Sequence, residues 1–431
     1  MLSYARFWWI IAFSCALFGG SVPARAQTPA SNDQLRVFLD CDVFGCDFDY
    51  FRKEVLFVDY VRDRKDASLH VLVTTQSTGG GGIEYTLTFI GLKELAGSAD
   101  TLRYTSGNSA TDDDRRKGIA KTLKLGLVRY VAHTAQAGRL QITFAAPLAT
   151  DTVVKSKRDP WNYWVFRMRA GGNFSGESSQ NFTSINGSVS ANRTTKAWKI
   201  NTSINGNYNE SSFTFTEGEE FKSYSRSFGA SELIVKSLTD RWSAGQRASV
   251  STSTFANQKL AARFAPAIEY NFFPYDQSTR HSLTLQYSLG LNSYHYRDTT
   301  IYEKLSEVRA DQSLVASIGM TQPWGSLNGS IEGANYLDDF SKRRLVLFTS
   351  VNARLFKGFS LSLFSSVGLV HDQLSLPKTG ATDEEILLQR KQLETSYRYF
   401  AGVSLTYSFG SIFNNIVNPR FEGSSGSFYF F

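Results

Sequence analysis

The chain of 431 residues lacks several features that would place it in a common class. Past residue 26 it has no uninterrupted apolar run of helix-spanning length, which argues against a helical membrane protein. Its histidines are few and dispersed (His70, His133, His281 and His371 lie far apart), so neither a metal site nor a cofactor is expected. The formal net charge is +7, but the basic residues are scattered, which argues against nucleic-acid binding.

Residues 1–26 have the pattern of a secretory signal peptide. Arg6 supplies the positive charge, residues 7–17 form the apolar stretch, and residues 24–26 are a small-x-small cleavage site. The apolar stretch is short and has no stop-transfer flank, which favours cleavage over a membrane anchor.

Cleavage leaves two cysteines, Cys41 and Cys46. Two nearby cysteines in an oxidising compartment usually pair, and the loop 42–45 is flexible enough to close. A redox motif more often has two intervening residues, and a zinc site needs further Cys or His partners that are missing nearby. We expect a structural disulfide, with free thiols as the main alternative.

Residues 27–150 predict a small periplasmic α/β sandwich, and 151–160 a linker. Asp47 is a suitable N-cap for a helix with apolar positions 48, 51, 55 and 58, and a longer helix begins at 112–114 and extends to Val131. The expected strands are 36–39, 69–75, 83–90, 101–105 and 139–144.

Two features of this region invite a functional interpretation. Gly79–Gly82 could bind phosphate, but a strand follows it instead of a helix, so we expect a hairpin turn. The acidic residues Asp40, Asp42, Asp47 and Asp49 could hold Ca²⁺, but their spacing is not that of a Ca²⁺ loop, and helix capping explains the last two.

From residue 161 onward the chain alternates. Leu283, Leu285, Tyr287, Leu289 and Leu291 occupy odd positions, and polar or small residues stand between them. Successive strand residues point to opposite faces, so such a block has one apolar and one polar face. About ten residues of this kind cross a bilayer at a tilt. The pattern predicts a mainly β fold, a transmembrane antiparallel β-barrel at 161–410.

About twelve strand blocks are expected, an even number as in single-chain bacterial barrels. Their approximate spans are 161–176, 180–194, 196–215, 222–238, 242–256, 259–273, 280–297, 307–322, 325–338, 343–356, 359–374 and 395–410. Short connections, such as 194–195 and 357–358, alternate with longer ones, such as 376–394. Barrels have short periplasmic turns, so we expect the short turns on the side of the α/β domain.

The polar faces of these blocks predict the lining of the barrel. The charged residues expected there are Arg167, Arg169, Lys199, Arg247, Arg263 and Arg354, against Glu232, Glu269 and Glu332. One interpretation is a lumen filled by salt bridges and Asn/Ser networks. The other is a narrow, anion-tolerant pore. A barrel of this size is narrower than the wide porins, which favours a packed or narrow lumen.

The chain ends in Phe428-Tyr429-Phe430-Phe431, and it resembles bacterial outer-membrane β-barrel proteins, which commonly end in phenylalanine. The resemblance covers the signal peptide and residues 161–431. It departs from the usual pattern because alternation stops at Phe409 and a tail, 411–431, follows. Either the tail folds back below the barrel, or the final strand lies nearer the end.

One pair of residues resembles a catalytic arrangement. Ser293 and His295 are two apart and both are expected on the outward face, as in outer-membrane phospholipases. The order is Ser then His, and no Asn position is identifiable, so a polar rim beside Tyr294 and Tyr296 is the preferred interpretation.

The sequence therefore predicts a non-enzymatic integral protein of the bacterial outer membrane, with its N-terminal domain in the periplasm. It would anchor that domain as an adaptor for a periplasmic envelope protein, or act as a narrow channel. A porin-like, anion-tolerant diffusion channel and an outer-membrane phospholipase are the alternatives. Outer-membrane lipid is the expected surrounding, and nucleic acid is not an expected partner.

Overall fold

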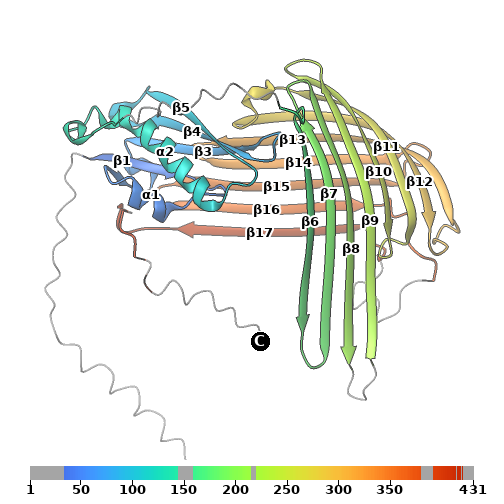
Figure 1. The fold of residues 1–431 in the computed structure, drawn as a ribbon. Helices are drawn as coiled ribbons and strands as arrows, with labels where there is room; N and C mark the ends of the chain where they lie inside the picture. Colours follow the sequence, from blue (N-terminus) through green and yellow to red (C-terminus); the bar gives the residue numbers. More distant parts are fainter. Residues whose placement is uncertain are drawn as a thin grey trace, which may run out of the picture.

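The computed structural model describes residues 34–143, 159–214, 220–379, 392–413, 415–418 and 420. The signal peptide, most of the predicted linker and the C-terminal phenylalanines lie outside these residues. The described part forms two units, a small α/β domain and a sheet of twelve strands (Figure 1).

The α/β domain contains a mixed five-stranded sheet with the order β2-β1-β3-β4-β5. Its elements are β1 (Leu35–Asp40), α1 (Phe48–Glu54), β2 (Val58–Tyr60), η1 (Arg64–Asp66), β3 (Leu69–Ser77), β4 (Ile83–Gly91), η2 (Lys93–Leu95), β5 (Ala99–Ser106), α2 (Asp112–Val131) and η3 (Ala137–Arg139). Strands β2 and β3 run parallel to β1, and β3, β4 and β5 are antiparallel.

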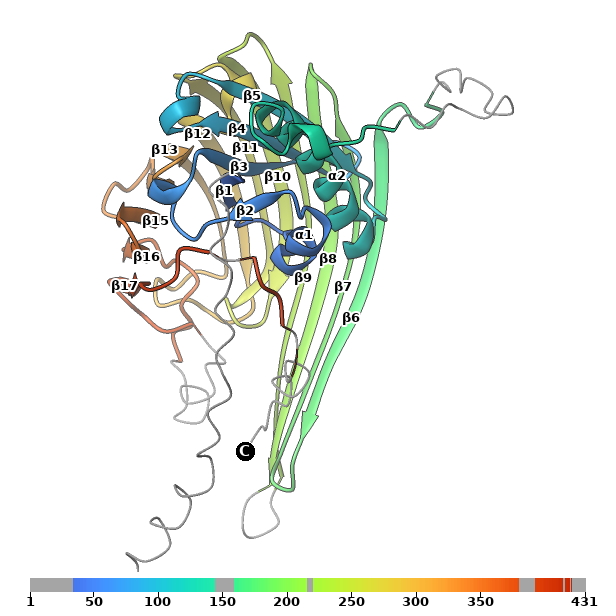
Figure 2. The same cartoon turned by 90° about the vertical axis from the view of Figure 1, so that its left-hand side faces the viewer.

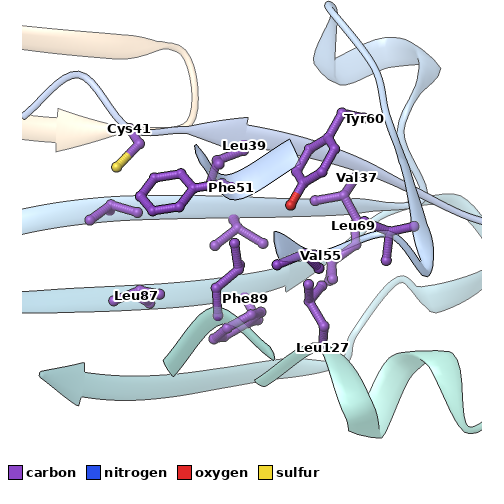
Figure 3. Packing of buried hydrophobic residues seen from close by; sticks show 14 of the residues in the cluster. Val37, Leu39, Cys41, Phe51, Val55, Tyr60, Leu69, Leu87, Phe89 and Leu127 are labelled. Atoms are coloured by element: carbon purple, nitrogen blue, oxygen red, sulfur yellow. The ribbon is translucent and has the colours of Figure 1, made fainter. Parts of the chain in front are cut away.

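The larger apolar cluster of the domain joins the two helices to this sheet. Phe51 and Val55 from the first helical segment and Leu127 from α2 lie against Leu87 and Phe89 of β4 (Figure 3). The disulfide between Cys41 and Cys46 closes the loop before α1, as expected, with a Cα–Cα distance of 6.0 Å.

The helix starts of this domain follow the sequence. The Asp47 side chain accepts a hydrogen bond from the Tyr50 backbone N–H at 2.9 Å, which confirms the predicted cap of α1. The longer helix begins at Asp112, as predicted, and Thr111 and Asp114 form a reciprocal capping box.

Two predicted elements of the domain are wrong. The first helix ends at Glu54, and Val58, which was assigned to its apolar stripe, belongs to β2 and pairs with Leu35 of β1. Residues 139–143 form no strand, since Arg139 ends η3 and Leu140 packs against the core without a strand partner in the described residues. Val58 is buried and Leu140 is partly buried by long-range contacts that their local pattern does not reveal.

The second unit contains twelve strands, which confirms the predicted number. They are β6 (Trp164–Gly176), β7 (Gln180–Thr194), β8 (Trp198–Thr214), β9 (Glu220–Ser237), β10 (Trp242–Ser253), β11 (Gln258–Asn271), β12 (His281–Tyr296), β13 (Ser306–Gln322), β14 (Gly325–Tyr336), β15 (Arg343–Phe356), β16 (Phe359–Val370) and β17 (Tyr397–Tyr407), with η4 (Tyr275–Gln277) between β11 and β12. Each strand pairs antiparallel with its neighbours in sequence, from β6 to β17.

The sheet curls around a concave face, and the α/β domain lies across one end of it (Figure 2). The expected closure into a barrel is not present, because β6 and β17 form opposite edges and no pairing joins them in the described residues. Unpaired edge N–H and C=O groups can be hydrated where water reaches them, so an open edge carries little cost outside a bilayer.

No helix in the described part of the chain is both long and apolar enough to cross a membrane.

The α/β core gives a matched test on helix α2. Leu123 is fully buried and Leu125 is 62% exposed on the same helix. Leu123→Ala should lower the free energy of unfolding of the domain by about 2–5 kcal/mol, because it leaves a cavity, whereas Leu125→Ala should cost about 0.5 kcal/mol or less. Hydrogen exchange of peptides from 112–131 in rising urea measures both. Equal effects would contradict this packing.

Candidate functional site

Strand register fixes which side chains share the concave face of the twelve-stranded sheet. Directly paired residues of antiparallel strands point to the same side. The row that starts at Arg167 runs through Ser190, Ser203, Ser231 and Ser249 to Arg263, across β6 to β11. By the same rule Arg169, Lys199, Arg247, Glu269 and Glu332 also lie on the concave face.

Glu232 is the predicted lining residue that lies on the convex face, so its assignment is wrong. It pairs with Thr202 of β8 and Ala248 of β10, and Ala248 pairs with Phe264. All of these lie on the convex face. Apolar Leu233 and Val235 occupy the concave positions of β9 instead.

The concave face holds a cavity of about 660 Å³. Its charged lining consists of Lys199, Arg247, Arg263 and Arg344 against Glu269 and Glu332. Serine side chains and the apolar residues Leu233, Val235 and Val315 also belong to the wall. The cavity therefore combines an excess of cations with an apolar section.

Two of the arginines in the cavity wall are held by carboxylates. The Arg263 guanidinium donates to both Asp311 oxygens, at 2.7 and 3.2 Å. Arg344 bridges Glu332 at 2.7 Å and Asp372 at 3.0 Å. The prediction of salt bridges inside the sheet thus describes part of this wall. Sequence reasoning missed Asp311 and Arg344, although both stand at polar positions of alternating blocks.

Residues 371–379, which follow β16, fold inward at the end of the sheet away from the α/β domain. Leu374 is only 5% exposed and packs in a cluster with Tyr294, Tyr296 and Tyr336. Further along this segment, Pro377 forms an isolated bridge with Thr300, which lies between β12 and β13. This segment narrows the far end of the concave space.

The α/β domain is fastened to the other end by an ion pair between the buried Asp40 carboxylate and the partly exposed Arg354. Arg354 at the end of β15 donates to both Asp40 oxygens at 2.7 Å, and its guanidinium also lies 5.1 Å over the Phe38 ring. His70 Nε2 lies 3.2 Å from Asp40 Oδ2. Arg354 shares the concave parity of β15, but its guanidinium is engaged by the domain and it is not among the residues that line the cavity. Its assignment as a lining residue is therefore corrected.

Short turns of the sheet make further contacts with the domain, on the side where they were expected. Lys357 pairs with Asp66 at 2.7 Å, and the Gly358 N–H donates to Asp63 at 2.6 Å. At the opposite side of the sheet, the Gly79–Gly82 turn approaches the ends of β6 and β7. A Cβ on Gly79 would lie 2.9 Å from the Thr194 carbonyl oxygen, and one on Gly81 would meet Arg167. The glycine turn thus permits a close backbone approach.

The described part of the tail, residues 411–413 and 415–418, returns to the α/β domain, which supports the first of the two predicted paths. Phe413 forms a bridge with Val61, and the Arg62 N–H donates to the Ile412 carbonyl at 2.9 Å. The Asn415 side chain bonds both the Tyr60 N–H and the Asp59 carboxylate. The tail therefore extends the β2 edge of the small sheet.

Ser293 and His295 lie on the convex face, as expected, since their partners Ala262 and Leu260 stand at convex positions of β11. In the described residues no hydrogen bond joins the two side chains, and no carboxylate or amide is bonded to His295. The arrangement offers no oriented base.

No protein-family model matches the chain, and no curated protein matches it. Among solved structures, a NanC porin matches with a TM-score of 0.29 and 9% identity, over 56% of this chain and 99% of that one. The β domain of the Bordetella autotransporter BrkA gives 0.23 and 13%, over 57% and 98%. The translocator domain of autotransporter NalP from Neisseria meningitidis gives 0.18 and 10%, over 57% and 81%. TM-scores this low define no shared fold.

Two titratable groups at the junction, His70 and Asp40, have pKa values below their ordinary values. Burial lowers the pKa of His70, because the cation would lose its hydration, and the bond to Asp40 only partly opposes this. Burial would raise the pKa of Asp40, but hydrogen bonds from His70 and Arg354 hold this pKa below its usual value. His70 is therefore neutral and Asp40 ionised at neutral pH.

The depressed pKa of His70 predicts a pH dependence. An unfolded histidine binds protons below pH 6.5, whereas the buried ring resists them, so stability is present above 6.5 and falls as the pH drops below it. His70→Gln should flatten this loss, and exposed His133→Gln should leave it unchanged. Thermal melting of the domain from pH 7 to 5, followed by hydrogen exchange, measures it, and identical pH slopes in all three proteins would contradict the assignment.

Proposed function

We propose that the chain is an outer-membrane β-barrel that forms a narrow, cation-lined channel, with its own α/β domain covering the periplasmic mouth. In this proposal β6 and β17 close the sheet when a bilayer removes water from their edges, since an unpaired backbone group in lipid costs several kcal/mol. The protein would be non-catalytic.

The distribution of side chains across the sheet supports the membrane part of this proposal. Convex residues such as Ile204, Phe264, Leu289, Leu347 and Val403 are large, apolar and exposed. Such an extended apolar surface would aggregate in water and fits a lipid environment.

The proposal that the domain covers the mouth rests on its contacts near both edges of the sheet. Asp40, Asp63 and Asp66 bind the ends of β15 and β16, and the glycine turn lies against β6 and β7. An adaptor that only hung from the barrel would need an attachment at one point. The anchor function remains the second candidate, and its test is capture of an envelope protein by the crosslinked full-length chain.

Adjacent residues of β12 test which face meets lipid. Leu289 is convex and 45% exposed, while Ser288 is concave and its hydroxyl lies 2.8 Å from that of Ser313. Leu289→Arg should lower the free energy of unfolding in lipid vesicles by about 2–4 kcal/mol, because the charge would lie in hydrocarbon. Ser288→Arg should lower it much less. Urea titration of refolding into vesicles measures both. If Ser288→Arg costs as much as Leu289→Arg, the two faces are assigned wrongly or the sheet is not in lipid.

Release of the cover tests the channel. Asp40→Ala removes the carboxylate that holds Arg354, so the contact between the α/β domain and β15 is weakened. The full-length variant should conduct several-fold more in planar bilayers than the unaltered protein. Asp49→Ala, which removes only a local pair with Arg52, is the matched control. Absence of conductance in Asp40→Ala and in a chain lacking residues 27–150 would eliminate the channel and leave the anchor.

A further inference from the structure

The cavity in the concave face contains two cations that no carboxylate neutralises. In the described residues, Lys199 and Arg247 have neither an ion pair nor a side-chain hydrogen bond, whereas Arg263 and Arg344 are each held by acidic side chains. Both free cations are in the cavity lining. Both side chains are exposed within the open sheet, and two unpaired cations that face the same cavity attract an anion.

Strand register places an apolar step between these two cations. Lys199 of β8 pairs with Val235 of β9, and Arg247 of β10 pairs with Leu233 of β9. Leu233 and Val235 are successive residues on the concave face of one strand, and both line the cavity. The next strand offers Ala265 beside Arg247, so small side chains keep space open in front of the step.

The remaining charges of the cavity restrict the ligand. Glu269 keeps its place through hydrogen bonds from Tyr275 at 2.9 Å and Gln286 at 3.4 Å. Glu332 is engaged by Arg344 on the opposite wall. These carboxylates repel a second negative charge, so the site disfavours polyanions.

We propose that this cavity binds a small organic monoanion, a carboxylate carried on an apolar body. The carboxylate lies between Lys199 and Arg247, and the apolar body rests on Leu233 and Val235. Transport of this ligand rests on the proposed channel. Binding does not, since the binding site lies on one wall of the sheet. Inorganic anions use the cations but gain nothing from the apolar step.

Equilibrium binding to the full-length protein in detergent tests the proposal, with hexanoate as the probe and acetate and inorganic phosphate as comparisons. Lys199→Gln/Arg247→Gln should weaken hexanoate binding about tenfold or more, because both charged hydrogen bonds to the carboxylate are lost. Leu233→Asn should weaken hexanoate binding and leave acetate binding unchanged. Arg226→Gln, on the convex face of β9, is the matched control and corrects for binding of the probe to detergent.

The outcomes separate the ligand from the channel. Hexanoate binding that survives the double substitution, or that falls equally in Arg226→Gln, overturns the site. Equal binding of phosphate, acetate and hexanoate, unaffected by Leu233→Asn, overturns the organic ligand in favour of a plain anion site. Binding in a protein that never conducts supports the site and removes the channel, whereas conductance without binding removes the site alone. Hydrogen exchange of β8 to β10 verifies that each variant is folded.

Discussion

The structure depends on one constraint, the coupling of side-chain alternation to strand register. Because directly paired residues share a face, the parity of one strand fixes the faces of all twelve. The row from Arg167 to Arg263 shows this, since six strands place arginine at its ends and serine between. A slip of one residue in any strand would move its charges to the convex side and its apolar residues to the concave side.

The same constraint explains what the sequence could predict. Blocks with clean alternation, such as β12, gave the number of strands and their faces correctly. Strand β9 failed because its pattern is reversed near the end: Leu233 and Val235 are concave, while Glu232 is convex. A rule that places apolar residues on the convex face therefore assigns the residues of β9 to the wrong faces. The reversal is itself informative, since those two apolar residues form the step between Lys199 and Arg247.

Other residues were out of reach because their environment comes from distant parts of the chain. Arg354 has the parity of a lining residue, and only the docked domain, 314 positions away in sequence, shows that it binds Asp40. Val58 keeps helical spacing from Phe51 but is buried as a strand beside β1. The capping box at Thr111 was readable in principle, because Asp114 stands three residues on, at the position from which its carboxylate reaches back.

The arrangement of the α/β domain also gives a reason for the four consecutive glycines. Ion pairs fasten the domain at β15 and β16, where carboxylates meet Arg354 and Lys357. On the side of β6 and β7 the glycine turn lies close to Thr194 and to the Arg167 side chain, and a side chain at Gly79 would collide with the Thr194 carbonyl, which cannot move without breaking the strand end. One side of the junction is thus held by charge and the other by shape. A charged contact can be released by protonation or by a competing ion, whereas a steric fit cannot. If the domain moves, the β15–β16 side is therefore the one expected to open, with the glycine turn as the pivot.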